Sequence, residues 1–295
     1  RIVMTIAASL VKELRERTGA GMMECKKALI DAEGVIDAAQ DLLRTRGQAK
    51  ADKKAGRVAA EGQIMTAVSP GGEVTAIMEV NCETDFVAKD DNFQRFAQMA
   101  VELAAAQQPG TVDELMAIAT SDGQTLEESR RDLVAKIGEN IGVRRFDYVR
   151  PAGQLGTYFH GTRIGVLVDV VGGDTDLGKD LAMHIAASNP RYLSADDVPE
   201  EIRANERRIL SEQAQGEGKP AEIVAKMVEG RLRKYLNEIV LLGQTFVKDP
   251  DFSIEKLLKQ RGATVKSFVR LEVGEGIEKK SENIADAVAA MHSAA

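Results

Sequence analysis

Side chains that commonly carry out covalent chemistry are scarce in this sequence. Its 295 residues include two cysteines, Cys25 and Cys82, which lie in unrelated segments, and only three histidines. That spacing provides neither a cluster of metal ligands nor a nucleophile paired with a base. No Gly-x-x-x-x-Gly-Lys-Ser/Thr loop, dinucleotide fingerprint or nucleophile elbow is present either. The sequence therefore predicts a protein that is not an enzyme and that has no cofactor or metal site of its own.

A polar stretch, residues 81–93, is better suited to recognition of another molecule than to catalysis. It joins an alternating apolar run, residues 74–80, to a helical stripe of apolar residues that begins at Phe93. Either Asp91 or Asn92 is the expected N-cap of that helix. The stretch therefore connects a predicted strand to a predicted helix.

Phe86 lies inside this connection and belongs to neither predicted element, so the apolar pattern does not assign it to the core. Two interpretations are open from the residues alone. In the first, Thr84 and Asp85 cap a turn and Phe86 folds back under it, since aromatic side chains are usually buried. In the second, the turn holds Phe86 outward, where it can contact a partner.

Four motifs along the chain carry a family resemblance. Thr84-Asp85-Phe86-Val87-Ala88-Lys89 follows Asn-Cys-Glu, and a second motif runs from Leu10 to Leu29. Shorter matches are His160-Gly161 together with residues 163–168, and the segment from Phe268 to Gly276. In sequence and in order these motifs resemble the bacterial elongation factor Ts family, over nearly the whole chain. The resemblance implies a guanine nucleotide exchange factor that binds GDP-bound elongation factor Tu and promotes release of magnesium and GDP during translation elongation.

The resemblance also implies roles for individual residues. It assigns partner binding and dislocation of the partner's magnesium to Thr84, Asp85, Phe86 and Val87. It implies further partner contacts at Met22, Met23, Cys25, Lys26, Lys54, Ile137, Gly138, His160, Lys179 and Val247. Two residues depart from the family pattern, which often has histidine at the position of Asp180 and an apolar residue at the position of Lys248. These departures put the implied contacts there in doubt.

Simpler interpretations compete with these roles. The two methionines can belong to the core, Lys54 to a solvated spacer, and His160 to a solvated turn. His184 lies in an apolar helical segment and is expected to be a packed residue with its hydrogen bonds satisfied. The alternative function is a non-catalytic adaptor or scaffold protein associated with translation, and a hydrolase or redox enzyme is a more remote third option.

Composition limits the classes of partner. The formal net charge is −7, which argues against a general nucleic-acid binder because phosphate contacts need a basic face. No apolar run approaches the roughly 20 residues that span a bilayer, and no signal peptide opens the chain, so a cytoplasmic protein is expected. Arg1-Ile2-Val3 precede Met4, the natural-looking start, and are interpreted as an addition.

The patterns predict an α+β fold. Three short helical patterns between residues 7 and 47, separated by breaks at Thr18-Gly19-Ala20-Gly21 and Glu33-Gly34, resemble a ubiquitin-associated (UBA-like) domain, and residues 48–62 look like a basic linker with some helical tendency. Residues 63–109 and 154–190 look like two copies of a hairpin followed by a helix, in which Thr84-Asp85-Phe86 aligns with Thr175-Asp176-Leu177.

The rest of the chain completes this organisation. Two charged helices with a narrow apolar seam predict an antiparallel helical arm that can dimerise or bind a second protein. Residues 244–247 and 268–273 are expected as strands, and Ser281 as the cap of a C-terminal helix that docks on the partner. The predicted domains are 1–57 for the three-helix domain with its linker, 58–150 for the first core subdomain, 151–195 with 243–280 for the second, 196–242 for the arm and 281–295 for the C-terminal helical module.

Overall fold

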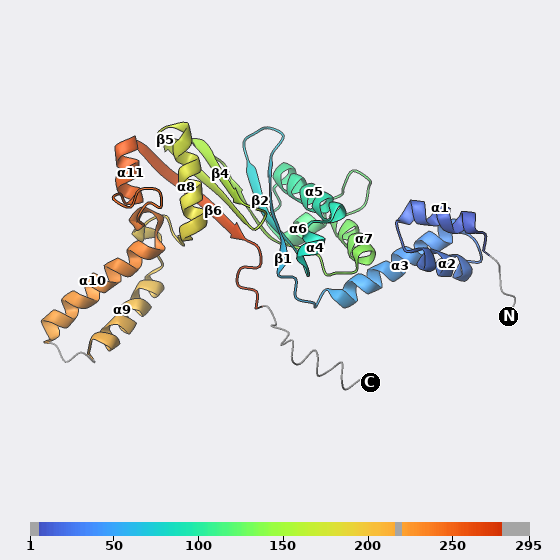
Figure 1. Cartoon of the computed structure of the whole chain (residues 1–295), viewed down its shortest axis with the longest axis horizontal. Helices are drawn as coiled ribbons and strands as arrows, with labels where there is room; N and C mark the ends of the chain where they lie inside the picture. Colours follow the sequence, from blue (N-terminus) through green and yellow to red (C-terminus); the bar gives the residue numbers. More distant parts are fainter. Residues whose placement is uncertain (1–5, 216–219, 279–295) are drawn as a thin grey trace. The chain divides into compact units, whose positions relative to one another are not determined.

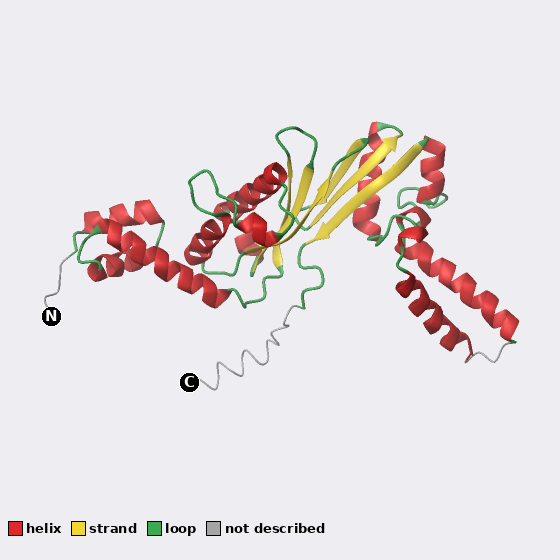
Figure 2. Cartoon of the chain, turned by 180° about the vertical axis from the view of Figure 1, so that it is seen from behind, coloured by secondary structure: helices red, strands yellow, loops and turns green. Residues whose placement is uncertain are grey.

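The computed structural model describes residues 6–215 and 220–278 (Figure 1). The chain divides into two compact units. The first unit comprises Arg1–Met65, Met78–Phe146 and Val273–Ala295, and the second comprises Thr66–Ile77 and Asp147–Glu272. Arg1-Ile2-Val3 and the helix predicted after Ser281 lie outside the described residues. The mixture of helices with two three-stranded sheets agrees with the predicted α+β class (Figure 2).

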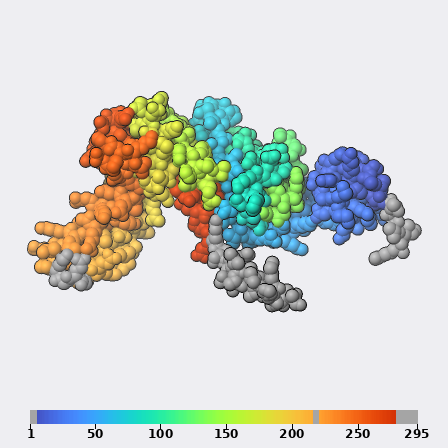
Figure 3. Space-filling model, in the orientation of Figure 1, coloured from blue at the N-terminus to red at the C-terminus, as the bar shows by residue number. Residues whose placement is uncertain are grey.

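Three helices open the first unit: α1 (Ala8–Thr18), α2 (Met22–Asp31) and α3 (Ile36–Lys54). They share a small core that includes Leu14, Cys25 and Leu29, and α1, α2 and the first part of α3 form one rounded body (dark blue, Figure 3). The predicted breaks between them are correct. The predicted linker is wrong in its first part, because α3 continues through the alanine- and lysine-rich segment to Lys54. Alanine and lysine are both strong helix formers, so no breaker stops the helix earlier.

The first sheet has the strand order β1-β2-β3, with β1 at Glu61–Val68, β2 at Thr75–Cys82 and β3 at Gly142–Val149. Every residue of β2 is buried, as expected for the central strand of a small sheet. The helices of this region are α4 (Asp85–Ala88), α5 (Asp91–Gln107), α6 (Val112–Met116) and α7 (Leu126–Ile137). The strand β3 and the helix α6 were not expected from the sequence.

Helix α5 confirms the predicted apolar stripe, since its residues from Phe93 to Ala105 that face one side are buried. Its N-cap is Asp90, and not Asp91 or Asn92 as predicted. Asp90 Oδ1 accepts hydrogen bonds from the backbone N–H groups of Asn92 at 2.8 Å and Phe93 at 3.3 Å. A cap must precede the first helical residue with extended backbone, and Asp90 meets this condition.

The second unit contains the antiparallel sheet β4-β5-β6, with β4 at Gln154–His160, β5 at Ile164–Gly172 and β6 at Ala263–Glu272. Helix α8 (Thr175–Ser188) packs on β4 and β5. A Cβ atom on Gly156 of β4 would lie 2.3 Å from the carbonyl oxygen of Gly178 in α8, so glycine is required at this close approach.

Two long helices of the second unit, α9 (Glu200–Gln215) and α10 (Ala221–Ile239), lie side by side (Figures 1 and 2). Their seam is the predicted apolar one, with Leu210, Ala214, Val228 and Leu232 buried. The short 3-10 helices η1 (Ala195–Asp197) and η2 (Leu241–Gly243) flank the pair.

The strand predicted at residues 244–247 is wrong. After η2 the backbone N–H of Phe246 donates to Phe252 O at 2.9 Å and that of Ile254 donates to Gln244 O at 2.9 Å. The segment therefore closes a local loop before α11 (Ile254–Arg261), a helix that was not predicted from the sequence. The later strand, β6, is confirmed, since it includes residues 268–272.

Both predicted hairpins are present, each followed by a helix, but their alignment requires a correction of one residue. Thr84 is the N-cap of α4, whereas Asp174 is the N-cap of α8. Asp174, and not Thr175, is therefore the structural counterpart of Thr84. Phe86 is the second residue after its N-cap, and the second residue after Asp174 is Asp176, so Asp176 is the counterpart of Phe86.

Candidate functional site

A single helical turn presents Phe86. Thr84 precedes α4 with extended backbone, at φ −125° and ψ 154°, and its Oγ1 accepts a hydrogen bond from Val87 N at 3.3 Å. Phe86 is 80% exposed, the largest exposed fraction among the large hydrophobic side chains of the described residues. The interpretation in which the ring folds back under the turn is therefore wrong, and the outward one is confirmed.

Buried neighbours fix the two ends of this turn. Cys82, at the end of β2, is fully buried, and its thiol donates to Thr84 O at 3.1 Å. Burial is the main cause that raises the pKa of the Cys82 thiol to about 12, so the sulfur stays protonated and unreactive. At the other end Ala88 is buried, and its carbonyl oxygen accepts a hydrogen bond from Gln63 Nε2. The turn is thus anchored on both sides of the exposed ring.

Asp85 adds a charge beside the ring. Its carboxylate lies 2.9 Å from Lys89 Nζ, one turn further along the chain. The hydrogen bond from Lys89 is the first cause that lowers the pKa of Asp85, so the carboxylate is ionised at neutral pH. Both side chains remain largely exposed, which leaves the carboxylate accessible to a partner, while Val87 is half-buried.

Residues after α7 hold the turn from the other side, through contacts that were not predicted from the sequence. Glu139 accepts hydrogen bonds from Thr84 N at 3.0 Å and from Thr84 Oγ1 at 2.7 Å. Asn140 N donates to Glu83 Oε1 at 2.6 Å. Gly138 is the left-handed C-cap of α7, with φ 89°. A glycine that ends a helix was visible in the sequence, but the destination of the carboxylate after it was not.

The helix α3 reaches the same loop through Lys54. The Nζ atom of Lys54 donates to Gly138 O, so this half-buried cation supports the loop from within its own unit. The solvated-spacer interpretation of Lys54 is therefore wrong. Ile137 and Gly138 are half-buried and retain some accessible surface.

The predicted contacts on α2 separate into exposed and buried groups. Met22 is 57% exposed, Met23 is 74% exposed and Lys26 is exposed, so the core interpretation of the methionines is wrong. Cys25 is fully buried against α1 and α3. A direct partner contact by the Cys25 thiol does not fit this burial, because its place on the helix faces the core of the three-helix body.

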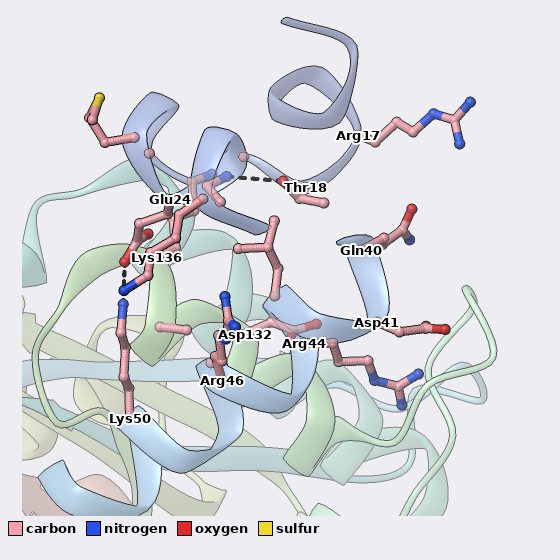
Figure 4. Close-up of a pocket in the computed structure, with 18 of the residues that line it drawn as sticks. Arg17, Thr18, Glu24, Gln40, Asp41, Arg44, Arg46, Lys50, Asp132 and Lys136 are labelled. Atoms are coloured by element: carbon pink, nitrogen blue, oxygen red, sulfur yellow. Dashed lines mark hydrogen bonds and ion pairs between the residues drawn. The ribbon is translucent and has the colours of Figure 1, made fainter. Parts of the chain in front are cut away.

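A cleft of about 1000 Å³ lies between α2, α3 and α7, and many of its lining side chains are cationic (Figure 4). Most of these cations are already paired with carboxylates. Lys50 is paired with Glu24, as the dashed contact in Figure 4 shows, and Arg46 Nη2 lies 2.7 Å from Asp31 Oδ2. Since these pairs cancel much of the positive charge, the cleft is not a strong site for an anion.

In the second unit three predicted contact residues are accessible. His160 at the end of β4 and Lys179 on α8 are exposed, and Val247 is 50% exposed. The two residues that depart from the family pattern pair with each other, because Lys248 Nζ lies 2.5 Å from Asp180 Oδ1. The two departures therefore form one ion pair, in which each charge has an opposite charge as its partner.

His184 has the packed role predicted for it. The ring is fully buried, its Nδ1 accepts from Val247 N at 3.3 Å, and its Nε2 lies 3.0 Å from Gln244 Oε1. Because Nδ1 accepts, Nε2 carries the proton and donates to Gln244. Burial lowers the pKa of His184 below its ordinary value, and the hydrogen bond with Gln244 offsets only part of this effect.

We expect this burial to make stability depend on pH. Unfolded His184 takes up a proton as the pH falls through 6.5, whereas the folded ring stays neutral until a lower pH. Stability is therefore fully present above that value and falls below it. The thermal unfolding midpoint is measured by circular dichroism at about pH 7.5 and about pH 5.5 for the wild type and for His184→Gln. The midpoint of His184→Gln should fall less on acidification than that of the wild type. His160→Gln, at an exposed ring, is the control, and an unchanged pH dependence in His184→Gln would contradict this assignment.

The chemistry of the described residues points to binding. Within residues 6–215 and 220–278, no group of three or more His, Cys, Asp or Glu side chains could hold a metal ion. Over the same ranges no helix has the length and apolar character needed to cross a bilayer. An accessible aromatic ring on an anchored turn, together with the accessible methionines of α2, is typical of a protein that acts by binding another protein.

Comparison with known proteins gives the family. Residues 83–275 match the model of the family described as elongation factor TS. Elongation factor Ts of Methylococcus capsulatus is 57% identical over 288 residues, which is 97% of this chain and 98% of that protein. Elongation factor Ts of Hydrogenovibrio crunogenus is 56% identical over 291 residues, 99% of each chain. The chain belongs to the elongation factor Ts family.

Proposed function

We propose that this chain is a guanine nucleotide exchange factor that binds GDP-bound elongation factor Tu and promotes release of magnesium and GDP during translation elongation. Membership of the elongation factor Ts family supports the proposal. The observation that carries it is the exposure of Phe86 on a turn that its own chain anchors at both ends. The factor performs no covalent chemistry and needs no cofactor.

The proposed mechanism is mechanical and electrostatic. A GTPase holds GDP through phosphate-cradling backbone groups, a lysine and a magnesium ion. Phe86 inserts between helices of the GTPase near the magnesium site, and Asp85 fixes the inserted turn through polar contacts, with Thr84 and Val87 beside it. The displaced helices release magnesium, and GDP follows.

The energetics of this mechanism are within reach of a few side chains. Weakening GDP binding a thousandfold requires a coupling free energy of about 4 kcal/mol. One or two interface residues that contribute ~2 kcal/mol or more each can supply it. Because coupling between two ligands is reciprocal, incoming nucleotide weakens the grip of the factor equally, which permits turnover.

Other accessible residues supply affinity and orientation in this proposal. They are Met22, Met23, Lys26, Ile137, Gly138, His160, Lys179 and Val247. The proposal also includes a UBA-like assignment for α1–α3, the domain boundaries given above, an arm (α9 and α10) that can dimerise, a C-terminal helical module, a cytoplasmic location, and no direct contact with nucleic acid or membrane.

Stopped-flow fluorescence tests the proposal directly. Elongation factor Tu loaded with fluorescent GDP is mixed with excess unlabelled GDP, with and without this chain. The proposal requires faster loss of fluorescence as the chain is added. If the chain binds the GTPase but leaves the release rate unchanged, the adaptor or scaffold alternative replaces exchange.

A further inference from the structure

We propose that Glu139 is a positioning residue for Phe86, acting through Thr84. The inference rests on the proposed exchange function and deepens it, because it names a side chain that sets the activity without being required to touch the partner. Glu139 lies 55 residues after Thr84 and accepts from both of its donors, N at 3.0 Å and Oγ1 at 2.7 Å. One carboxylate therefore fixes both the backbone and the side chain of the residue that starts the turn.

The turn needs such external support because α4 has only four residues. An isolated helical turn is unstable, since nucleation fixes several backbone dihedral angles in return for one hydrogen bond. The Thr84 hydroxyl has two tasks here: it donates to Glu139 and accepts from Val87 N at 3.3 Å. The direction of the Thr84 hydroxyl proton, and with it the cap, is set by Glu139.

The loop that carries Glu139 is itself held in place. Lys54 donates to Gly138 O, and Asn140 N donates to Glu83 Oε1 at 2.6 Å. Asn140 Nδ2 also donates to Arg57 O at 2.8 Å. The loop and the turn thus each contribute one carboxylate: Glu139 of the loop accepts from Thr84, and Glu83 before the turn accepts from Asn140. The arrangement resists both sliding and rotation of the turn.

This geometry predicts a specific kinetic effect. If Glu139 orients the inserted Phe86 ring (the wedge), loss of Glu139 lowers the maximal rate of GDP release at saturating factor, because the complex forms but the ring is poorly placed. The factor concentration that gives half the maximal rate should change little. A residue that supports only general folding would instead lower the thermal midpoint and reduce the amount of active factor.

A double-mutant cycle tests the coupling. Maximal release rates are measured by stopped flow for the wild type, Glu139→Ala, Phe86→Ala and the double variant, with Glu102→Ala, an exposed carboxylate on α5, as control. We expect Glu139→Ala to lower the maximal rate about tenfold, and the control to match the wild type. In the Phe86→Ala background, loss of Glu139 should have almost no further effect, since no ring remains to be positioned.

The conservative variant Glu139→Gln keeps the side-chain volume and one acceptor, and should restore part of the lost rate. It also serves in the cycle if Glu139→Ala does not fold. A wild-type maximal rate in both variants, or effects of Glu139 and Phe86 that multiply independently, would overturn the inference. Failure of the wild-type chain to accelerate release would overturn the proposed function instead, so the two failures are distinguishable.

Discussion

Replacement of Phe86 by alanine is expected to slow factor-stimulated GDP release by roughly 30-fold or more, since ~2 kcal/mol is the least that an interface hot spot contributes. The ring is 80% exposed, so its contribution is made on the partner and not within the chain. The thermal midpoint of Phe86→Ala should therefore stay close to that of the wild type. Stopped-flow release of fluorescent GDP, combined with circular dichroism, measures both quantities.

A matched control distinguishes the specific effect of Phe86 from the general effect of removing an exposed hydrophobic side chain. Val68 is 60% exposed and belongs to no predicted contact, so Val68→Ala should release GDP at the wild-type rate. Full acceleration by Phe86→Ala would remove the wedge mechanism even if the protein remained a partner of the GTPase.

The largest expected effect on stability comes from Glu79→Ala. Glu79 is fully buried in β2 and accepts from Arg145 Nε at 2.7 Å, Arg144 Nη1 at 3.0 Å and Gly274 N at 2.7 Å. Removing the carboxylate leaves these donors without their shared acceptor. Breaking a buried ion pair in this way costs ~3–5 kcal/mol, and the lower end applies here because both arginines are partly hydrated.

A loss of about 3 kcal/mol corresponds to a fall of about 6–12 °C in the thermal unfolding midpoint, at the scale that applies to domains of roughly 150–250 residues. Thermal unfolding followed by circular dichroism checks the prediction. Glu275→Ala is the control, because that carboxylate pairs with the same Arg145 at 3.0 Å but is 39% exposed, and exposed pairs contribute less than ~1 kcal/mol. Equal effects of the two substitutions would show that burial of Glu79 is not decisive.

Local patterns in the sequence were sufficient for elements whose partners lie nearby. Apolar periodicity located α5, and glycines stand directly after the ends of α1 and α7. Periodicity failed at residues 244–247, where alternation is real, since Phe246 is buried between the exposed Thr245 and Val247. Alternation reports which side chains face inward, and it does not report whether the backbone bonds to a sheet or to a nearby loop.

The candidate site was predictable only in its exposed part. The motif resemblance gave Asp85 and Phe86, and the structure gives the ring the outward position that this role requires. Glu139 escaped notice because its contact spans 55 residues, and no local spacing encodes such a pairing. Cys25 illustrates the opposite error, since a contact role was carried over to a side chain that the fold buries.

The repeated hairpin-and-helix units are not equivalent in one respect. At the place of Phe86 the second repeat has Asp176, and there the helix runs on without interruption through Ser188. Within the described residues, the duplication therefore places such a ring on the first repeat and not on the second. In the proposed mechanism each chain opens one GTPase at a time, and it must dissociate before it serves the next.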